Sequence, residues 1–265
     1  MSERSLLLEA VSDVARVAGA IANRHFRSRL QVEMKADGSP VTLADRAAEA
    51  AARDWIARRF PNDDVLGEEM ASIDRGAARR WIIDPIDGTK SYVRGVPLWG
   101  TLIAVAEGES VIASAAYFPT LDEMLCAAME LGCWWNGTRA SVSTVDRLSE
   151  ATVLTTDERF AAAPARGAAW LRLAPRAKLS RSWGDCYGYL LVATGRAEAM
   201  VDGALAPWDA AALFLAVTEA GGAFTDWNGR STAFGGNAIA TNAALAVEVR
   251  ALLGADVTTR EARGS

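Results

Sequence analysis

The most informative segment of the chain reads Trp81-Ile82-Ile83-Asp84-Pro85-Ile86-Asp87-Gly88-Thr89-Lys90. Its three leading apolar residues predict a short buried strand that ends at Asp84, and the Asp-Pro and Asp-Gly pairs predict a turn. Asp84 and Asp87 can therefore converge on one point in space. Two carboxylates held that close repel each other unless a cation lies between them. With no histidine or cysteine in the segment, the donors are all oxygen atoms, which favours Mg²⁺ over zinc or copper.

The same segment also has the pattern of an anion site. A helix that begins at Gly88 and Thr89 directs its first backbone N–H groups at a negatively charged ligand, as in many phosphate sites. A metal beside an anion pocket indicates a phosphoester substrate. Two other interpretations stay open at this point. The aspartates can be ordinary turn residues, or they can be the acid and base of a glycosidase, although glycosidase carboxylates usually come from separate elements.

Helices and strands are predicted on both sides of this segment. Apolar residues recur at three and four positions from Leu6 to Phe26, which predicts an amphipathic helix. A second helix is predicted after Thr42, a plausible N-cap, with Asp45 in its first turn and an end before Pro61. An antiparallel meander is predicted downstream, with strands at residues 99–106, 110–117 and 123–127 and a hairpin at 132–136.

After residue 146 the pattern changes to alternating strands and helices, which is typical of an α/β arrangement. The predicted strands cover residues 152–155, 178–180, 199–201 and 223–225, and the predicted helices cover 158–172, 184–193 and 208–220. We therefore divide the chain into an N-terminal α+β half, residues 1–146, and a C-terminal α/β half, residues 147–265. No long linker separates the halves, so a shared interface and a layered α/β fold are expected.

Composition excludes several classes of protein. The chain has 28 Lys and Arg against 33 Asp and Glu, a net charge of -5 with no basic block, so nucleic acid is not an expected partner. The single histidine, His25, excludes any mechanism that needs two. Cys126, Cys133 and Cys186 lack C-x-x-C spacing and indicate neither a disulfide framework nor a zinc site. No segment has the pattern of a signal peptide or a membrane span, so a cytoplasmic protein is expected.

Further acidic motifs accompany the first segment in a definite order. They read Lys35-x-Asp37-Gly38-Ser39-Pro40-Val41-Thr42-x-x-Asp45, Gly67-Glu68-Glu69, Trp208-Asp209-Ala210-Ala211 and Glu219-Ala220-Gly221-Gly222. Together with the first segment they resemble the Mg²⁺-dependent phosphatases of the inositol monophosphatase superfamily, over nearly the whole chain. The resemblance implies a five-layer αβαβα sandwich, as in inositol monophosphatase and fructose bisphosphatase, with the active site between the halves. It also implies a homodimer.

The resemblance implies roles for individual residues as well. Two or three Mg²⁺ ions would be held by the backbone carbonyl of Ile86 and the side chains of Glu68, Asp84, Asp87 and Asp209. Thr89 and Asp45 would take the proton from the attacking water, which would also lie near Glu68. Lys35 and Lys90 would lie near the phosphate. Such a mechanism requires no histidine.

The metal motifs do not separate the substrates of this superfamily. The segment Ser180-Arg181-Ser182-Trp183-Gly184-Asp185-Cys186-Tyr187-Gly188-Tyr189 resembles the histidinol-phosphate phosphatase branch, because inositol phosphatases tend to have a small residue in place of Asp185. Histidinol phosphate carries an ammonium group, and a cation favours a carboxylate partner. Asp185 and Asp202 are therefore candidates for substrate recognition, with Arg181 orienting one of them. The alternatives are that Asp185 caps a helix and that Asp202 belongs to a turn.

The sequence therefore predicts a Mg²⁺-dependent phosphomonoesterase that acts on L-histidinol phosphate, in histidine biosynthesis. Inositol 1-phosphate and related sugar or nucleotide 3'-phosphates stay open as alternative substrates. A catalytically silent protein on the same fold is not favoured, because every expected metal ligand and the catalytic pair are present. The residues expected to bind the small phosphorylated substrate are Gly88, Thr89, Arg181, Asp185, Asp202 and Asp209.

Overall fold

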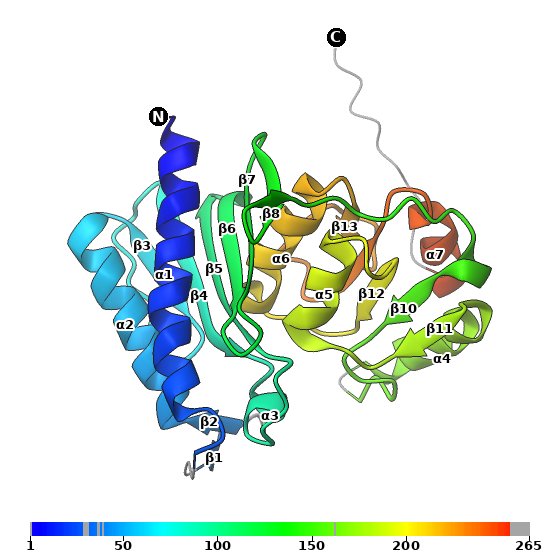
Figure 1. Cartoon of the computed structure of the whole chain (residues 1–265), viewed down its shortest axis with the longest axis horizontal. Helices are drawn as coiled ribbons and strands as arrows, with labels where there is room; N and C mark the ends of the chain where they lie inside the picture. The colour runs from blue at the N-terminus through cyan, green and yellow to red at the C-terminus, as the bar shows by residue number, and fades with distance from the viewer. Residues whose placement is uncertain (1, 29–31, 36–37, 39, 162, 255–265) are drawn as a thin grey trace.

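The computed structural model describes residues 2–28, 32–35, 38, 40–161 and 163–254, and Figure 1 shows this chain as five layers. Two long helices cover one face of a seven-stranded sheet, two further helices separate this sheet from a five-stranded sheet, and a last pair covers the far side of the second sheet. The predicted αβαβα sandwich is confirmed. The helices, in layer order, are α1 (Glu3–His25), α2 (Leu43–Arg59), α5 (Asp185–Ala193), α6 (Pro207–Glu219), α4 (Pro164–Leu173) and α7 (Ala246–Leu253).

The outer helices α1 and α2 follow the local sequence pattern. Leu7, Val11 and Val14 are among the buried residues of α1, which packs against the seven-stranded sheet and against α2. Thr42 is the N-cap of α2 and forms a capping box with Asp45, as the sequence predicts. The short strands β1 (Val32–Met34) and β2 (Pro40–Thr42) pair just before α2. The motif residues Asp37 and Ser39 lie outside the described residues.

The seven-stranded sheet carries the first segment of the sequence analysis. In spatial order its strands are β3 (Asp64–Gly67), β4 (Arg79–Asp87), β5 (Gly100–Glu107), β6 (Ser110–Phe118), β7 (Glu123–Ala128), β8 (Gly132–Trp135) and β9 (Thr138–Arg139). β3 runs parallel to β4 and all later neighbours are antiparallel, which confirms the predicted meander and hairpin. β4 extends past the predicted strand to Asp87, because pairing with β5 resumes there after an irregularity that begins at Asp84. The short helix α3 (Thr89–Tyr92) follows.

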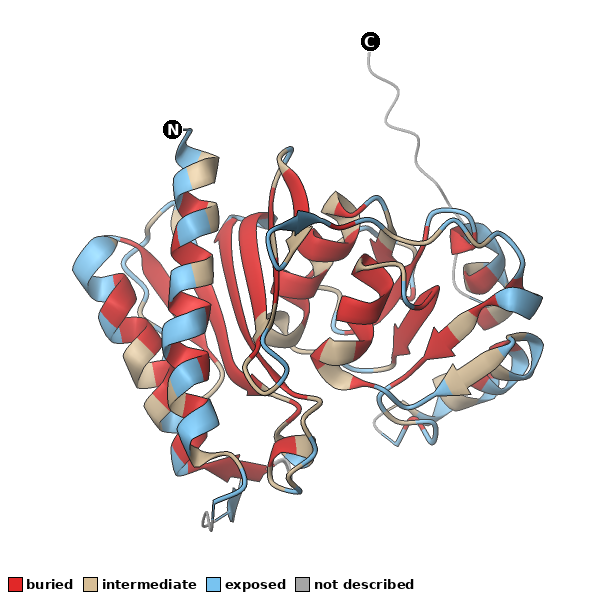
Figure 2. Ribbon diagram, in the orientation of Figure 1, coloured by how far each residue is buried: buried red, intermediate tan, exposed pale blue. Residues whose placement is uncertain are grey.

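The middle layer belongs to the C-terminal half of the chain but completes the core of the N-terminal half. α6 packs on β4, β5, β6 and β7 and on α5. Its buried side chains, such as Leu213, share one core cluster with Ile82 and Leu102 of the seven-stranded sheet. Figure 2 shows buried residues along most of α5 and in the middle of α6. The two halves therefore share a core, and the division into residues 1–146 and 147–265 stays a prediction about chain organisation.

The five-stranded sheet has the spatial order β11-β10-β12-β14-β13, with β10 parallel to both of its neighbours. Neither β14 nor α7 is predicted from the sequence, because several turn residues precede both elements. None of the described helices is both long enough and apolar enough to cross a membrane. The strands and the two 3-10 helices of this half are β10 (Thr152–Leu154), β11 (Leu179–Arg181), β12 (Ala199–Asp202), β13 (Ala223–Thr225), β14 (Ala238–Thr241), η1 (Leu148–Glu150) and η2 (Ala174–Arg176).

The helix predicted near residue 158 begins later. α4 starts at Pro164, whose ring suits the first turn of a helix. Before it, the carboxylate of Asp157 accepts the backbone N–H groups of Arg159 and Ala161, which closes a turn instead of a helix. The prediction of helix is therefore wrong at residues 158–161 and 163, and this turn instead borders a pocket described below.

Candidate active site

Three carboxylates meet where β4 ends and α6 begins. Asp84 and Asp87 come from β4, and Asp209 comes from the first turn of α6. One oxygen from each lies within 4.8 Å of the other two. Asp209 is 122 positions after Asp87 in the chain, so the packing of α6 on β4 brings the third carboxylate to the pair. This carboxylate cluster unites three of the predicted metal ligands.

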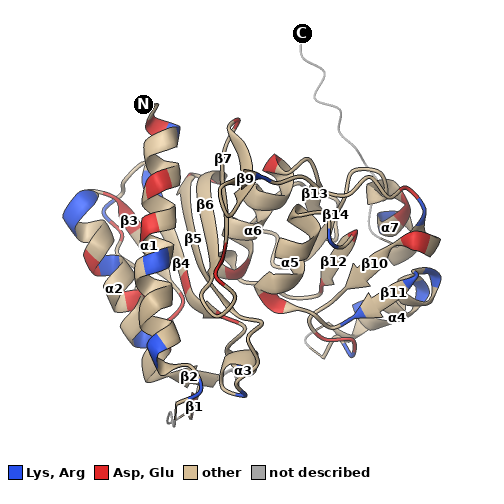
Figure 3. Cartoon of the chain, viewed as in Figure 1, with Lys and Arg blue, Asp and Glu red and all other residues tan. Residues whose placement is uncertain are grey.

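Backbone N–H groups hold these carboxylates in place. The N–H of Ile86 donates to Asp84 Oδ1 at 3.0 Å, and the N–H of Cys186, in the first turn of α5, donates to Asp87 Oδ2 at 2.6 Å. The N–H of the residue before α6 donates to Asp209 Oδ2 at 2.7 Å. The N-terminal ends of α5 and α6 therefore both meet the cluster, and their partial positive charge offsets part of its repulsion. Figure 3 shows acidic positions at the beginning of α5.

The electrostatics of the carboxylate cluster favour a bound cation. Burial raises the pKa of Asp84 well above its usual range, and the charges of Glu68, Asp87 and Asp209 raise it further. Burial also raises the pKa of Asp87 strongly and the pKa of Asp209 to about 6. A cation among these groups would favour their ionised form. The donors are all hard oxygen atoms, so the residues present fit Mg²⁺.

Glu68 lies beside the cluster and is paired with a lysine. Its N–H donates to the carbonyl of Ile83 on β4 at 3.2 Å. Its carboxylate accepts from Lys35 Nζ at 2.7 Å, and Glu69 accepts from the same Nζ at 2.6 Å. Burial raises the pKa of Glu69 to about 7. The sequence analysis places Lys35 near the phosphate but misses this ion pair, because no spacing rule connects residues 33 positions apart.

The predicted catalytic pair, Thr89 and Asp45, makes no direct hydrogen bond in the described part of the chain. The Thr89 hydroxyl donates to the carbonyl of Ile86 at 3.0 Å. Asp45 is buried, and its Oδ2 accepts the N–H of Thr42 at 2.8 Å and the hydroxyl of Thr42 at 2.6 Å. Its Oδ1 has no partner among the described residues. Asp45 therefore both caps α2 and keeps one buried oxygen as an acceptor.

Two adjoining pockets, of about 240 and 300 Å³, open beside the carboxylate cluster. Lys90 and Thr156 line both pockets, Asp202 lines the smaller one and Asp185 lines the larger one. Lys90 connects these pockets with the cluster. It belongs to α3, the short helix that begins directly after Asp87 and Gly88. The two acids that the sequence singles out for substrate recognition therefore line neighbouring pockets.

Asp185 occupies the first position of α5, and Gly184 is the N-cap. The alternative that Asp185 is the capping residue is therefore not what the structure shows. Its backbone φ is +50°, which is uncommon for a residue other than glycine. The pKa of Asp185 is raised to about 6, because burial and the charge of Asp202 raise it more than the charge of Lys90 lowers it. Its carboxylate thus lies between a negative and a positive neighbour.

Asp202 ends β12 in a strand, not in a turn. Its Oδ1 accepts the N–H of Thr156 at 3.0 Å, and its Oδ2 accepts the hydroxyl of Tyr189 at 2.9 Å. A carboxylate has about four lone-pair sites, so Asp202 keeps acceptor capacity toward the pocket. Neither Thr156 nor Tyr189 is identified by the sequence analysis, because their partners are distant in the chain.

Arg181 does not orient either acid. It is exposed on β11, an edge strand of the five-stranded sheet, and its guanidinium donates to the carbonyl of Ser180 at 2.7 Å. Among the described residues it forms no ion pair with Asp185 or Asp202, contrary to the prediction. The segment that follows Arg181 does bring Asp185 to the pocket, but the side chain of Arg181 is exposed to solvent.

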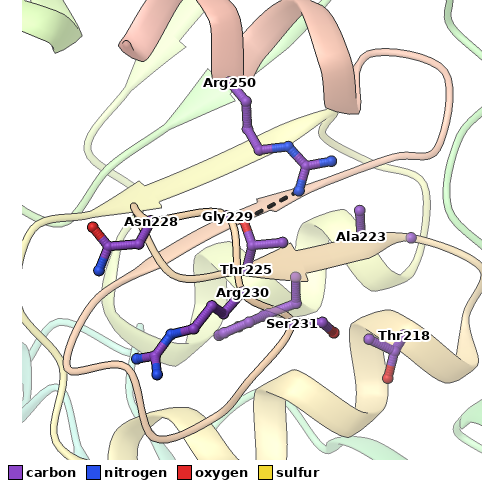
Figure 4. Close-up of a pocket in the computed structure, with 10 residues that line it drawn as sticks. Thr218, Ala223, Thr225, Asn228, Gly229, Arg230, Ser231 and Arg250 are labelled. Atoms are coloured by element: carbon purple, nitrogen blue, oxygen red, sulfur yellow. Dashed lines mark hydrogen bonds between the residues drawn. The ribbon is translucent and has the colours of Figure 1, made fainter. Parts of the chain in front are cut away.

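A third cavity, larger than these two pockets, lies elsewhere. It measures about 770 Å³ and is lined by the end of α6, by β13, by residues 228–231 and by Arg250. Figure 4 shows Arg250 directed toward Thr225, whose hydroxyl it contacts at 3.2 Å. No Asp or Glu is among the described residues that line this cavity. Because Asp209 lies at the opposite end of α6, the large cavity is separate from the carboxylate cluster.

Comparison with known proteins identifies the family of this chain. The profile of the inositol monophosphatase family matches residues 3–261. The histidinol-phosphatase of Chlorobaculum parvum is 41% identical over 233 residues, which cover 88% of this chain and 90% of the relative, and that of Streptomyces coelicolor is 40% identical over 231 residues, which cover 82% and 84%. The crystal structure of extragenic suppressor protein suhB from Bartonella henselae gives a TM-score of 0.88 at 27% identity and covers 94% of this chain and 98% of that chain. The chain therefore belongs to the inositol monophosphatase family and is a phosphoric monoester hydrolase.

Proposed function

We propose that this protein hydrolyses L-histidinol phosphate to L-histidinol and phosphate in a Mg²⁺-dependent reaction, as a step of histidine biosynthesis. The observation that carries the proposal is the carboxylate of Asp185 on the wall of a pocket beside the carboxylate cluster. A cationic substrate favours such a partner, whereas a neutral polyol does not require one. The two relatives named histidinol-phosphatase, at 41% and 40% identity, support the same substrate.

The metal would be held by oxygen atoms of this chain. Asp84, Asp87 and Asp209 would share two or three Mg²⁺ ions with Glu68 and with the backbone carbonyl of Ile86. When bound, Mg²⁺ supplies positive charge that activates water at neutral pH and stabilises the developing charge on the phosphoryl oxygens. The inositol monophosphatase family is metal-dependent, and the mutual proximity of three carboxylates, of which Asp84 is buried and the other two half-buried, supports that chemistry here.

Thr89 and Asp45 would move the proton of the attacking water. The buried Oδ1 of Asp45 is an acceptor without a partner among the described residues, and burial raises the pKa of this carboxyl group. A carboxylate with a raised pKa is a stronger base than an exposed one. The Thr89 hydroxyl, now bonded to the carbonyl of Ile86, would rotate to pass the proton on. Glu68 would orient the water from the side of β3.

The start of α3 would bind the phosphate group. The first N–H groups of a helix have no acceptor within the helix, and Gly88 and Thr89 open this one. Gly88 has a φ of +87°, and a Cβ added to it would lie 3.0 Å from the carbonyl oxygen of Leu98 and 3.2 Å from Asp185 Oδ2. A side chain at this position would therefore crowd the wall between phosphate and pocket. Lys90 would add positive charge on the same side.

The ammonium group of the substrate would pair with Asp185, and Asp202 would accept a further hydrogen bond in the adjoining pocket. Inositol 1-phosphate and related sugar or nucleotide 3'-phosphates are the second candidates, since Asp202 keeps lone pairs that suit a hydroxyl group. We also propose that the protein works as a homodimer in the cytoplasm. Light scattering after size-exclusion chromatography tests the homodimer.

A substrate panel tests the proposed function. Phosphate release with Mg²⁺ would be measured from histidinol phosphate, inositol 1-phosphate, fructose 1,6-bisphosphate and adenosine 3',5'-bisphosphate. We expect the highest kcat/KM for histidinol phosphate. A higher value for inositol 1-phosphate would replace the proposed substrate while keeping the phosphatase, and no release from any of the four would remove both.

We expect Thr89→Ala to lower kcat about tenfold and to leave KM nearly unchanged, because its hydroxyl assists a proton transfer that occurs only in the transition state. Steady-state kinetics with histidinol phosphate measures both constants. Thr218→Ala is the matched control, since its hydroxyl also donates to backbone carbonyls but lies at the far end of α6. Wild-type kcat in Thr89→Ala would contradict the assigned role.

We expect Asp185→Ser to lower kcat/KM for histidinol phosphate by one to two orders of magnitude, in line with a charge-assisted hydrogen bond of roughly 1.5 to 3 kcal/mol. Inositol 1-phosphate should be affected far less, because it presents no cation to this position. The ratio of kcat/KM for the two substrates cancels general damage to the metal site. An unchanged ratio would show that Asp185 does not recognise the ammonium group.

A further inference from the structure

Thr156 connects the two acids that line the substrate pockets. It lies two positions after Leu154, the last residue of β10, and it lines both pockets. Its backbone N–H donates to Asp202 Oδ1 at 3.0 Å. Its hydroxyl Oγ1 accepts the backbone N–H of Asp185 at 2.8 Å. Thr156 therefore links the end of β12 to the first residue of α5 through two hydrogen bonds. Asp185 is 29 positions from Thr156 in the sequence, and Asp202 is 46 positions from it.

The hydrogen bond to Thr156 matters for Asp185 because the backbone of Asp185 has a positive φ. A φ of +50° is sterically disfavoured for residues with a Cβ, although Asp tolerates it better than most. A conformation of this kind persists when the surrounding structure holds it. The hydrogen bond from its own N–H to Thr156 acts directly on the peptide unit that precedes the unusual φ.

The neighbouring glycine shows how closely Thr156 meets the start of α5. A Cβ added to Gly184 would lie 2.3 Å from Thr156 Cα and 2.7 Å from Thr156 Oγ1. No side chain fits in that space, so the backbone of α5 rests directly on Thr156. On the opposite side, Asp185 Oδ2 lies against Gly88 at the start of α3. Asp185 is therefore held at two points, its backbone N–H by Thr156 and its carboxylate beside Gly88.

We propose that Thr156 is a positioning residue for substrate specificity: its hydroxyl holds Asp185 in the left-handed conformation that directs the carboxylate at the cationic group of the substrate. This inference rests on the proposed function, because it gives Asp185 the recognition role. Asp202 in turn holds the backbone of Thr156 by accepting its N–H. Without the hydroxyl, the first turn of α5 relaxes and the carboxylate leaves its place beside the phosphate end of the pocket.

The substitution Thr156→Val tests the proposal, because it removes the hydroxyl that accepts the N–H of Asp185, and with it the side-chain interaction that lowers the pKa of Asp202, while keeping the size of the side chain and the N–H that binds Asp202. Thr156 is exposed, so the variant should fold normally. Thr156→Ser keeps the hydroxyl and serves as the rescue. Thr241→Val is the matched control, since the Thr241 hydroxyl is buried on β14 without a hydrogen-bond partner among the described residues.

The readout is the ratio of kcat/KM for histidinol phosphate over inositol 1-phosphate. We expect Thr156→Val to lower this ratio about five- to tenfold, the loss of one hydrogen bond, and Thr156→Ser and Thr241→Val to keep it within about twofold. An unchanged ratio in Thr156→Val, or an equal loss on both substrates with a lower melting temperature, would overturn the proposal.

A crystal structure of Thr156→Val separates this inference from the proposed function. We expect Asp185 to leave the positive φ region in the variant, and retention of φ near its present value would overturn the positioning role whatever the kinetics. Asp185→Ser can leave the substrate ratio unchanged while Asp185 does move in Thr156→Val. That result would contradict recognition by Asp185 and would support the positioning of Asp185 by Thr156. If Asp185→Ser lowers the ratio and Thr156→Val does not, recognition by Asp185 stands and the role of Thr156 fails.

Discussion

Asp209→Asn should lower kcat at least ~10²-fold, because the loss of one charged metal ligand costs several kcal/mol of transition-state stabilisation and each ~1.4 kcal/mol is tenfold. The asparagine keeps an oxygen that accepts the N–H at the start of α6, so the cap of the helix survives. Removing one of three mutually repelling carboxylates should leave the melting temperature of the metal-free protein unchanged or higher. Steady-state kinetics with Mg²⁺ and thermal denaturation with EDTA measure the two effects. Asp87→Asn should behave alike in catalysis.

Asp226→Asn is the matched control for this loss of charge. Asp226 is also a buried acid that accepts backbone N–H groups, from Asn228 and Arg230, but it belongs to the loop after β13. We expect it to cost stability, through its ion pair with Arg230, and to leave kcat within about threefold. Near wild-type turnover in Asp209→Asn would show that the carboxylate cluster is not the metal site.

Exhaustive removal of metal should abolish phosphate release, and Mg²⁺ should restore it. The donors near the cluster are carboxylate and carbonyl oxygens, which suit Mg²⁺ and Mn²⁺, so Mn²⁺ should also support activity. Ca²⁺ tolerates looser geometry and more ligands, and we expect it to inhibit. Phosphate release after EDTA treatment and desalting, with each ion added back, is the measurement.

Thermal denaturation gives a second readout that does not depend on turnover. A ligand that binds only the folded state raises its stability, so Mg²⁺ should raise the melting temperature of the wild type. The shift should be smaller in Asp209→Asn, which retains two of the three clustered carboxylates. Full activity after complete metal removal, or a melting temperature that Mg²⁺ does not change, would contradict the proposed mechanism.

Local sequence patterns predict the elements that carry the site. The capping box of Thr42 and Asp45, the buried strand before Asp84, which continues to Asp87, and the antiparallel meander are all present in the structure. Each is specified by interactions between residues a few positions apart, or by apolar periodicity with turn residues between the strands. Where the local pattern is weak, the prediction is wrong, as at residues 158–161 before α4.

Residue pairings that need the whole fold are not predicted correctly. Arg181 faces solvent and pairs with neither acid, because β11 is an edge strand. Lys35 pairs with Glu68 and Glu69, which no sequence spacing indicates.

By itself, the sequence determined an oxygen-only acidic motif at the end of a buried strand, a motif that fits a metal and phosphate site. Such a motif is local, so its residues carry the information alone. Only the tertiary structure decided how Asp209 joins that motif, since the contact requires α6 to pack across the seven-stranded sheet. The tertiary structure likewise decided that Asp185 takes a positive φ against Thr156. The physical reason is that a long-range contact forms through packing of whole elements, which a stretch of sequence does not encode alone.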